Sequence, residues 1–151
     1  MLKLISELPL DKRIAGVHCV PVLENGNMMM VWDREEQGLT TFGGRLEGSE
    51  TIEEGLDREV MEEAGLILAE ERIPFACWYW ENTDTYTVWF LVKVKEFTKM
   101  PKGFEKTGYV IMNFETAIQM IARLEGIGER TEIIRRAGVL SGQIEGDGSS
   151  V

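Results

Sequence analysis

The segment Gly43–Leu66, GGRLEGSETIEEGLDREVMEEAGL, says more about the fold than any other part of this chain. From Thr51 to Ala64 its pattern is helical. Thr51 followed by Glu54 forms a capping box at the start. Gly65 is a typical terminator, since glycine readily adopts the left-handed conformation found just after a helix. The segment therefore predicts a helix over residues 51–64 with both ends capped.

Three carboxylates of this predicted helix lie on one face. Glu59, Glu62 and Glu63 are spaced so that their side chains project together. Like charges at this spacing destabilise a helix by a few tenths of a kcal/mol per pair, roughly 0.2–0.5. A hard cation such as Mg²⁺ or Mn²⁺ relieves that repulsion, because it takes oxygen ligands. On spacing alone, a metal site and a solvated acidic face remain equal alternatives.

An apolar stripe runs along the same helix beside the acids. It consists of Leu56, Val60 and Ala64, about a quarter-turn away from the carboxylates. This arrangement lets the helix pack on a sheet while its acids line the edge of a cleft.

The residues around the carboxylates match a longer pattern. They resemble the signature of the Nudix family, G-x5-E-x7-R-E-U-x-E-E-x-G-U with U aliphatic, over 23 residues from Gly44 to Leu66. One departure lies outside it, since many relatives have proline before the paired glycines where this chain has Phe42. The matching residues are Gly44, Glu50, Arg58, Glu59, Val60, Glu62, Glu63, Gly65 and Leu66.

This resemblance implies an enzyme that uses Mg²⁺ (or Mn²⁺) and water to split a diphosphate bridge. It implies that the Gly44 carbonyl, Glu59, Glu62 and Glu63 hold the metal, with Glu62 and Glu63 also counted as catalytic. Arg58 is expected to orient a carboxylate, either Glu50 or Glu62, through its planar guanidinium.

Two roles near the signature stay open. For Arg58 the alternative is a surface pair with Glu62, and for Glu50 both a structural brace and a metal ligand are considered.

Family members often recruit one further acid from a later loop. In this chain the loop Lys102–Gly108 holds one acid, so Glu105 is the candidate for a base or extra ligand. The alternative for Glu105 is a solvated acid.

The rest of the chain alternates predicted strands and helices. The Asn25-Gly26 pair between the first two predicted strands is a strong hairpin signal, and a second hairpin is expected around Asn82-Thr83-Asp84. The pattern predicts an α/β fold, a Nudix-type α/β/α sandwich with a mixed central sheet, in one domain over residues 1–140. Residues 141–151 are expected to form a polar, poorly ordered tail. The predicted strands are Ile14–Leu23, Met28–Asp33, Phe75–Trp80, Thr85–Val94 and Tyr109–Phe114, with further helices at Glu115–Arg123 and Glu129–Ala137.

The composition of the chain disfavours several classes of function. The net charge of −10 disfavours binding to nucleic-acid backbones. No apolar run is long enough to span a bilayer and no secretory signal is visible, so we expect a cytoplasmic protein that does not bind membranes. Cys19 and Cys77 are expected to be buried thiols, and the lone His18 a core or surface residue. Zinc and a Ser-His-Asp triad are therefore disfavoured.

The expected partner is a nucleotide-type small molecule: a nucleoside triphosphate or a nucleoside diphosphate derivative. An RNA 5′-pyrophosphohydrolase and a catalytically silent, nucleotide-sensing Nudix domain are the alternatives, and a homodimer is left open. Five aromatic residues could stack a base or belong to the core. They are Trp78, Tyr79, Trp80, Trp89 and Phe90.

Overall fold

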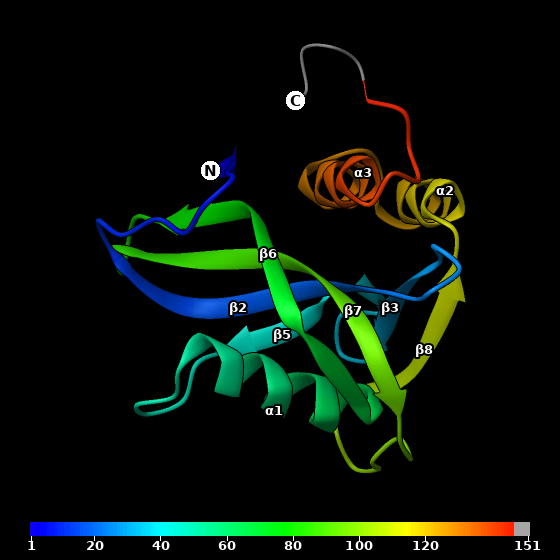
Figure 1. Ribbon diagram of the computed structural model, residues 1–151, viewed down its shortest axis with the longest axis horizontal. Helices are drawn as coiled ribbons and strands as arrows, with labels where there is room; N and C mark the ends of the chain where they lie inside the picture. The colour runs from blue at the N-terminus through cyan, green and yellow to red at the C-terminus, as the bar shows by residue number, and fades with distance from the viewer. Residues whose placement is uncertain (147–151) are drawn as a thin grey trace.

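The computed structural model describes residues 1–146 of the chain, which form eight strands and three helices (Figure 1). The strands are β1 (Leu2–Leu4), β2 (Arg13–Val22), β3 (Met28–Asp33), β4 (Gly38–Thr40), β5 (Phe42–Arg45), β6 (Leu66–Trp80), β7 (Thr85–Phe97) and β8 (Lys106–Met112). The helices are α1 (Ile52–Ala64), α2 (Phe114–Glu125) and α3 (Glu129–Leu140).

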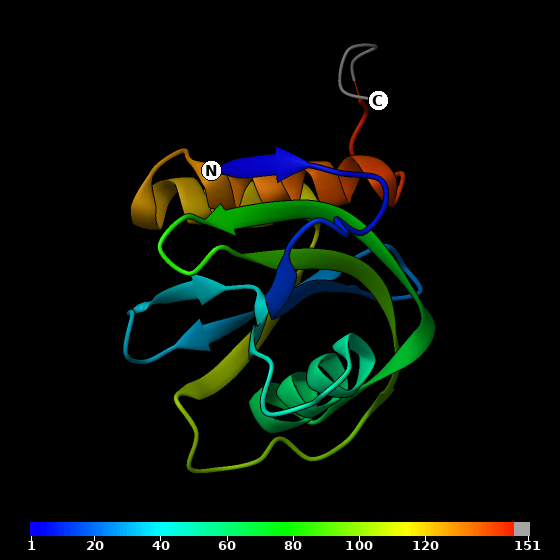
Figure 2. The same cartoon turned by 90° about the vertical axis from the view of Figure 1, so that its left-hand side faces the viewer.

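All eight strands belong to one mixed sheet. Its main path runs β1-β6-β7-β2-β3-β4, with β5 added to β2 and β8 added to β3. The β2–β7 pair is parallel and the remaining pairs are antiparallel. The sheet is strongly curved in Figure 2, where the long strands β6 and β7 bend around α1. The expected mixed central sheet is confirmed.

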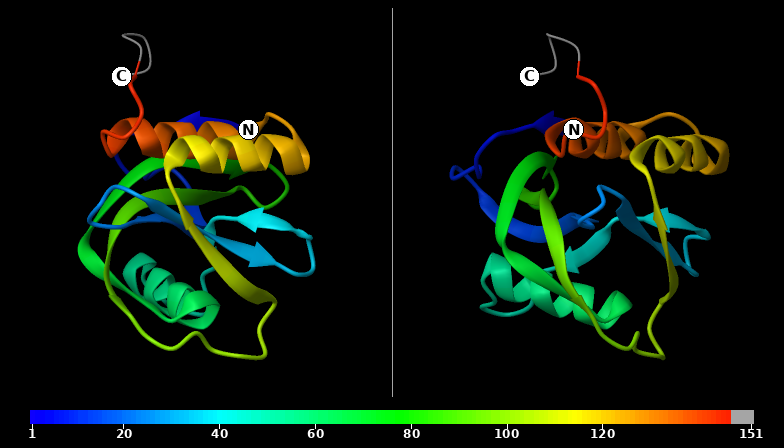
Figure 3. Two further views of the ribbon diagram at one scale, coloured as in Figure 1. Left: turned by 90° about the vertical axis from the view of Figure 1, so that its right-hand side faces the viewer. Right: turned by 45° about the vertical axis from the view of Figure 1, so that its right-hand side comes forward.

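Helices cover both faces of this sheet, which makes the predicted α/β/α sandwich (Figure 3). On one face, Leu56, Val60 and Ala64 of α1 are fully buried against strand residues such as Val17 and Val88. The apolar stripe predicted for this helix is thus confirmed. On the other face, α2 and α3 enclose a second core that contains Phe114, Ile121, Ile134, Val20 and Met30.

The ends of α1 follow the predicted capping. Thr51 Oγ1 accepts a hydrogen bond from the Glu54 backbone N–H at 3.1 Å, and Glu54 Oε1 accepts one from the Thr51 N–H at 2.9 Å. Gly65 ends the helix with φ at +70°. Local side-chain chemistry is therefore sufficient to begin and end this helix where the sequence indicated.

Long-range pairing changes several predicted strand limits. Residues 66–74 were not predicted as a strand, but they pair with β7 as the first part of β6. Strand β8 begins at Lys106, not at Tyr109, because Asp33 of β3 pairs with Lys106. Phe114 was placed in a strand, which is wrong: Asn113 accepts a hydrogen bond from the Thr116 N–H and starts α2.

The first predicted hairpin is more open than expected. Strands β2 and β3 are antiparallel, but their direct register contains only the pair Val22–Met28. Most of β2 pairs instead with β7 and with β5. Strands β4 and β5 lie between Gly38 and Arg45, where no strand was predicted.

Part of the segment after Ser141 is packed, contrary to the expectation of a poorly ordered tail. The N–H groups of Gln143 and Ile144 both donate to the Gly138 carbonyl, and the Ile144 side chain packs against the second core. Gly138 makes this possible, since a Cβ there would lie 2.7 Å from Ile144 Cδ1. Residues 147–151, the rest of that predicted tail, lie outside the described residues.

Cys19 and Cys77 are buried free thiols, as predicted. His18 is partly buried: its ring stacks on Trp89, and its Nδ1 lies 2.9 Å from Thr41 Oγ1. Between residues 1 and 146 there is no helix with the length and apolar character needed to cross a membrane.

Candidate active site

Three acids of α1 line a cavity of about 430 Å³, which also contacts Lys106 at the start of β8. This acidic pocket brings together Gly44, Glu59, Glu62, Glu63 and Glu105, all predicted as site residues. The loop before β8 supplies three of its lining residues, Gly103, Phe104 and Glu105. The full lining is Arg34, Gly43, Gly44, Glu59, Glu62, Glu63, Gly103, Phe104, Glu105 and Lys106.

Glu63 is the most deeply placed of these carboxylates, with a side chain 6% exposed. Its Oε1 accepts a hydrogen bond from the Gly43 backbone N–H at 2.8 Å, and its Oε2 lies 3.2 Å from Lys106 Nζ. Burial raises the pKa of Glu63 to about 7, although Lys106 and the Gly43 N–H act in the opposite direction. Such a carboxylate gains strongly from a nearby cation.

Arg58 lies behind the pocket and connects its acids. Its Nε and Nη2 form a bidentate contact with Glu50, at 2.6 and 3.0 Å. Its Nη1 donates to Glu59 Oε1 at 3.0 Å and to Glu62 Oε2 at 3.4 Å. The Arg58 guanidinium holds the pKa of Glu50 down at about 2. This geometry favours an orienting role for Arg58 and a bracing role for Glu50, which does not line the pocket.

Glu59 approaches the backbone at Gly44 because that residue lacks a side chain. A Cβ at Gly44 would lie 2.6 Å from Glu59 Oε1, closer than real Cβ atoms come to other atoms. The Glu59 side chain is 14% exposed. Burial raises its pKa, Arg58 opposes this, and the Glu62 charge adds to the rise. Glu62, 37% exposed, lies at the open side.

Lys106 and Asp33 are residues of this site that sequence reasoning missed. Lys106 Nζ lies 3.2 Å from Asp33 Oδ2 and 3.2 Å from Glu63 Oε2. Burial alone would lower the pKa of Lys106, but Glu63 and Asp33 hold it above its usual value. The three residues are far apart in sequence, so only the pairing of β3 with β8 brings Asp33 and Lys106 to the acids of α1.

Glu105 has an exposed side chain and reaches the pocket from the loop before β8. Its backbone carbonyl is fixed by the Arg34 N–H at 3.1 Å. This placement is compatible with a base or an extra ligand, and it also leaves the carboxylate open to solvent. Its role stays a prediction.

The aromatic residues of the pocket are not those suggested by the sequence. Phe104, 44% exposed, lines it, whereas the described part of the chain brings none of the five predicted aromatics there. Phe90 is buried in the first core, and Trp89 stacks on His18. Phe104 was missed because a lone aromatic in a loop carries no periodic signal.

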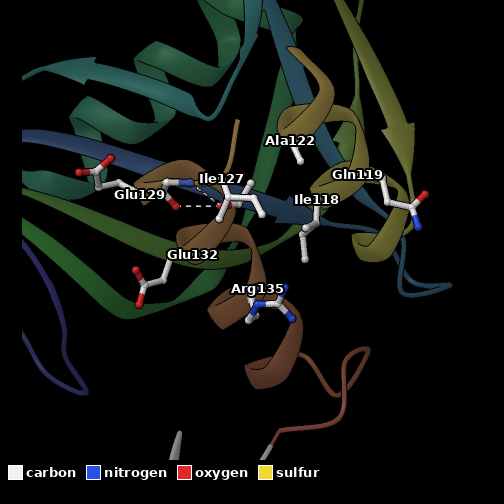
Figure 4. A pocket seen from close by; sticks show the side chains of 9 residues that line it. Ile118, Gln119, Ala122, Ile127, Glu129, Glu132 and Arg135 are labelled. Atoms are coloured by element: carbon white, nitrogen blue, oxygen red, sulfur yellow. Dashed lines mark hydrogen bonds between the residues drawn. The ribbon is translucent and has the colours of Figure 1, made fainter. Parts of the chain in front are cut away.

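A larger cavity, of about 740 Å³, lies between α2 and α3 (Figure 4). Ile118, Ala122 and Ile127 form its apolar part, and Glu129, Glu132 and Arg135 surround them. It contains none of the predicted site residues. The smaller acidic pocket is therefore the candidate active site, because it gathers the groups that can do chemistry.

The donor set of the acidic pocket suits a hard divalent cation. Glu59, Glu62, Glu63 and the Gly44 carbonyl offer oxygen atoms and no sulfur or imidazole. Throughout residues 1–146, no group of three or more His, Cys, Asp or Glu side chains is arranged to hold an ion by itself. Mg²⁺ does not require such a cage, since it commonly uses one or two carboxylates, several waters and substrate phosphates.

Comparison with solved structures shows the same fold in several Nudix proteins. The Bacillus subtilis pyrophosphohydrolase BsRppH superposes with a TM-score of 0.62 at 19% identity, over 74% of this chain and 70% of that one. DR0079 from Deinococcus radiodurans gives 0.61 at 19% identity, over 85% and 86%. A C. elegans Ap4A hydrolase gives 0.61 at 16% identity, over 84% and 98%.

No curated protein matches the sequence significantly. The family model described as the NUDIX domain matches residues 12–136, which include the whole sheet apart from β1, the acidic pocket, all of α2 and the first two thirds of α3. Together with the shared fold, this match establishes that the chain belongs to the Nudix hydrolases, a family of pyrophosphohydrolases.

Proposed function

We propose that this Nudix hydrolase is a Mg²⁺- or Mn²⁺-dependent enzyme that cleaves the diphosphate link of nucleoside triphosphates or nucleoside diphosphate derivatives. The observation that carries the proposal is the acidic pocket, where Glu59, Glu62 and Glu63 share one cavity with the Gly44 carbonyl. Two cationic side chains, Arg34 and Lys106, line the same cavity. Acids that can hold a metal and cationic side chains that can contact phosphate oxygens both suit this reaction.

In this mechanism Glu59, Glu62, Glu63 and the Gly44 carbonyl would hold the cation. When bound, the cation would neutralise phosphate oxygens and lower the pKa of an attacking water. Arg58 keeps Glu59 and Glu62 oriented through its Nη1 contacts, while Glu50 holds the guanidinium from the other side. Glu105, which lines the same pocket, would accept the proton of that water.

Phe104 and Arg34 are suited to hold the non-reacting part of the substrate. The exposed Phe104 ring offers an apolar surface for a base or sugar, and Arg34 offers a positive charge at the pocket edge. The cavity volume of about 430 Å³ suits a nucleotide-sized ligand. The acidic net charge favours a small nucleotide over RNA, because it disfavours contact with a long phosphate backbone.

The test is a phosphate- and pyrophosphate-release screen with Mg²⁺ or Mn²⁺. Its substrates are nucleoside triphosphates, nucleotide sugars, dinucleoside polyphosphates and triphosphorylated RNA. We expect turnover of a small nucleotide that vanishes in EDTA and in Glu63→Gln. Preferential turnover of the RNA would favour the RNA 5′-pyrophosphohydrolase alternative, and nucleotide binding without any turnover would favour the silent sensor.

A further inference from the structure

Lys106 contacts two carboxylates at once. Its ammonium lies inside the acidic pocket, 3.2 Å from Asp33 Oδ2 and 3.2 Å from Glu63 Oε2. The Lys106 side chain is 14% exposed, and both carboxylates are less exposed still. The Lys106 ammonium stabilises both of these poorly solvated carboxylates, because removing it leaves buried negative charge without a partner.

The two carboxylates differ in what else holds them. Asp33 Oδ1 accepts hydrogen bonds from the backbone N–H groups of Glu35 and Glu36, at 2.8 and 3.1 Å. Asp33 also faces Lys106 directly in the register of β3 with β8. The Asp33–Lys106 contact is therefore built into the sheet. The Glu63–Lys106 contact instead joins two separate elements, α1 and β8.

Glu63 is also the carboxylate for which a metal has to compete. Its Oε1 is engaged by the Gly43 N–H, and its Oε2 is the atom that Lys106 contacts. A divalent cation at Oε2 would need the place next to the ammonium, and two positive charges a few ångströms apart repel strongly in a poorly solvated site.

We infer that Lys106 is an internal counter-ion of Glu63 that a divalent cation has to displace, so that Lys106 sets the metal affinity of the site. This inference rests on the proposed function, in which Glu63 holds the metal. Lys106 acts here as a positioning residue. It stabilises the protein without metal and weakens metal binding, while Asp33 keeps the displaced ammonium at the pocket.

The experiment titrates the full chain with Mg²⁺ in the absence of substrate, by calorimetry at pH 8, and measures melting temperature in EDTA. The variants are Lys106→Met, which removes the charge, and Lys106→Arg, which keeps it. Lys102→Met, in the loop before β8, is the surface control. Should Lys106→Met fail to fold, Lys106→Gln removes the charge and retains a hydrogen-bond donor for Glu63.

The expected result is a Mg²⁺ dissociation constant at least tenfold lower in the neutral Lys106 variant, together with a lower melting temperature in EDTA. Lys106→Arg and Lys102→Met should stay close to wild type in both measurements. Unchanged or weaker Mg²⁺ binding in the neutral variants overturns the inference about Lys106.

Glu63→Gln separates this outcome from failure of the proposed function. If wild type binds Mg²⁺ and Glu63→Gln does not, the metal site stands whatever Lys106 does. If Mg²⁺ binds neither wild type nor any Lys106 variant, the metal assignment and the inference about Lys106 both fail. Binding that becomes measurable only in the neutral Lys106 variants supports the inference.

Discussion

Replacing Gly44 with alanine should separate the activity of this protein from its stability. The added Cβ would lie 2.6 Å from Glu59 Oε1, 2.9 Å from its Cδ and 3.0 Å from its Oε2. All three atoms belong to the end of a flexible side chain, so Glu59 can rotate away while the backbone stays in place. Gly44, unlike Gly43, is not among the glycines with positive φ, so alanine causes no backbone strain there.

The size of the effect follows from this distance. To restore an ordinary contact of about 3.4 Å, the carboxylate has to move by about 0.8 Å, and a misplacement near 1 Å can cost on the order of 10²-fold in rate. Arg58 keeps its two contacts with Glu50, so a weaker Arg58–Glu59 contact should cost about 1–2 kcal/mol. Gly→Ala at a compatible position regains about 0.4–1 kcal/mol through the unfolded chain.

Two other glycines provide matched controls. At Gly43, φ is +145° and a Cβ would lie 2.1 Å from the Val17 carbonyl oxygen, which is backbone and cannot rotate away. Gly43→Ala should therefore unfold or destabilise the protein by roughly 3 kcal/mol or more. At Gly108 a Cβ would meet nothing within 4 Å, so Gly108→Ala should be neutral.

The measurements are the melting temperature in EDTA and kcat/KM on the substrate found by the screen. Gly44→Ala should melt within a few degrees of wild type and lose about 10²-fold in kcat/KM. Full activity in a folded Gly44→Ala protein would refute the claim that the close approach of Glu59 to Gly44 matters for the reaction. A loss of stability as large as that of Gly43→Ala would show that Glu59 is held more rigidly than its contacts indicate.

Three further predictions concern other parts of the molecule. If Glu105 is the base, Glu105→Gln should lower kcat by roughly 10²–10⁴-fold with little change in KM. A higher metal concentration needed for activity would instead identify Glu105 as a metal ligand, and unchanged kinetics would identify it as a solvated acid. Burial lowers the pKa of His18 from 6.5 to about 4, so between these pH values the unfolded protein binds a proton that the folded protein does not. The neutral His18 ring therefore contributes up to about 3 kcal/mol to the free energy of unfolding above pH 6.5, and this contribution is lost as the pH falls towards 4. By urea unfolding, the free energy of unfolding should fall less between pH 7 and pH 4.5 in His18→Asn than in wild type. An equal fall in both proteins would contradict the interpretation that burial keeps the His18 ring neutral. Ending the chain after Leu140 should lower the free energy of unfolding by about 1–2 kcal/mol, since Ile144 packs against the second core, while the activity of the folded protein should persist; unchanged stability would show that this packing is unimportant.

The sequence by itself determined the features that depend on neighbours within a few residues. Thr51 with Glu54, and Gly65, placed both ends of α1, and the three-to-four-residue spacing placed Leu56 and Val60 on its buried side. Hydrogen bonds and side-chain directions within a helix are local, so they can be derived from spacing alone. The signature from Gly44 to Leu66 similarly predicted which carboxylates share a face, and it identified the family.

Only the tertiary structure decided what those carboxylates face. Lys106 and Asp33 meet Glu63 because β8 pairs with β3, and the first half of β6 forms a strand because β7 lies beside it. Such contacts depend on segments that fold together from distant parts of the chain, and no short-range pattern encodes them. The charge balance of the site could therefore not be derived from the spacing of its acids. From the sequence, repulsion between Glu63 and the neighbouring acids was the argument for a metal, but in the structure the buried ammonium of Lys106 contacts Glu63.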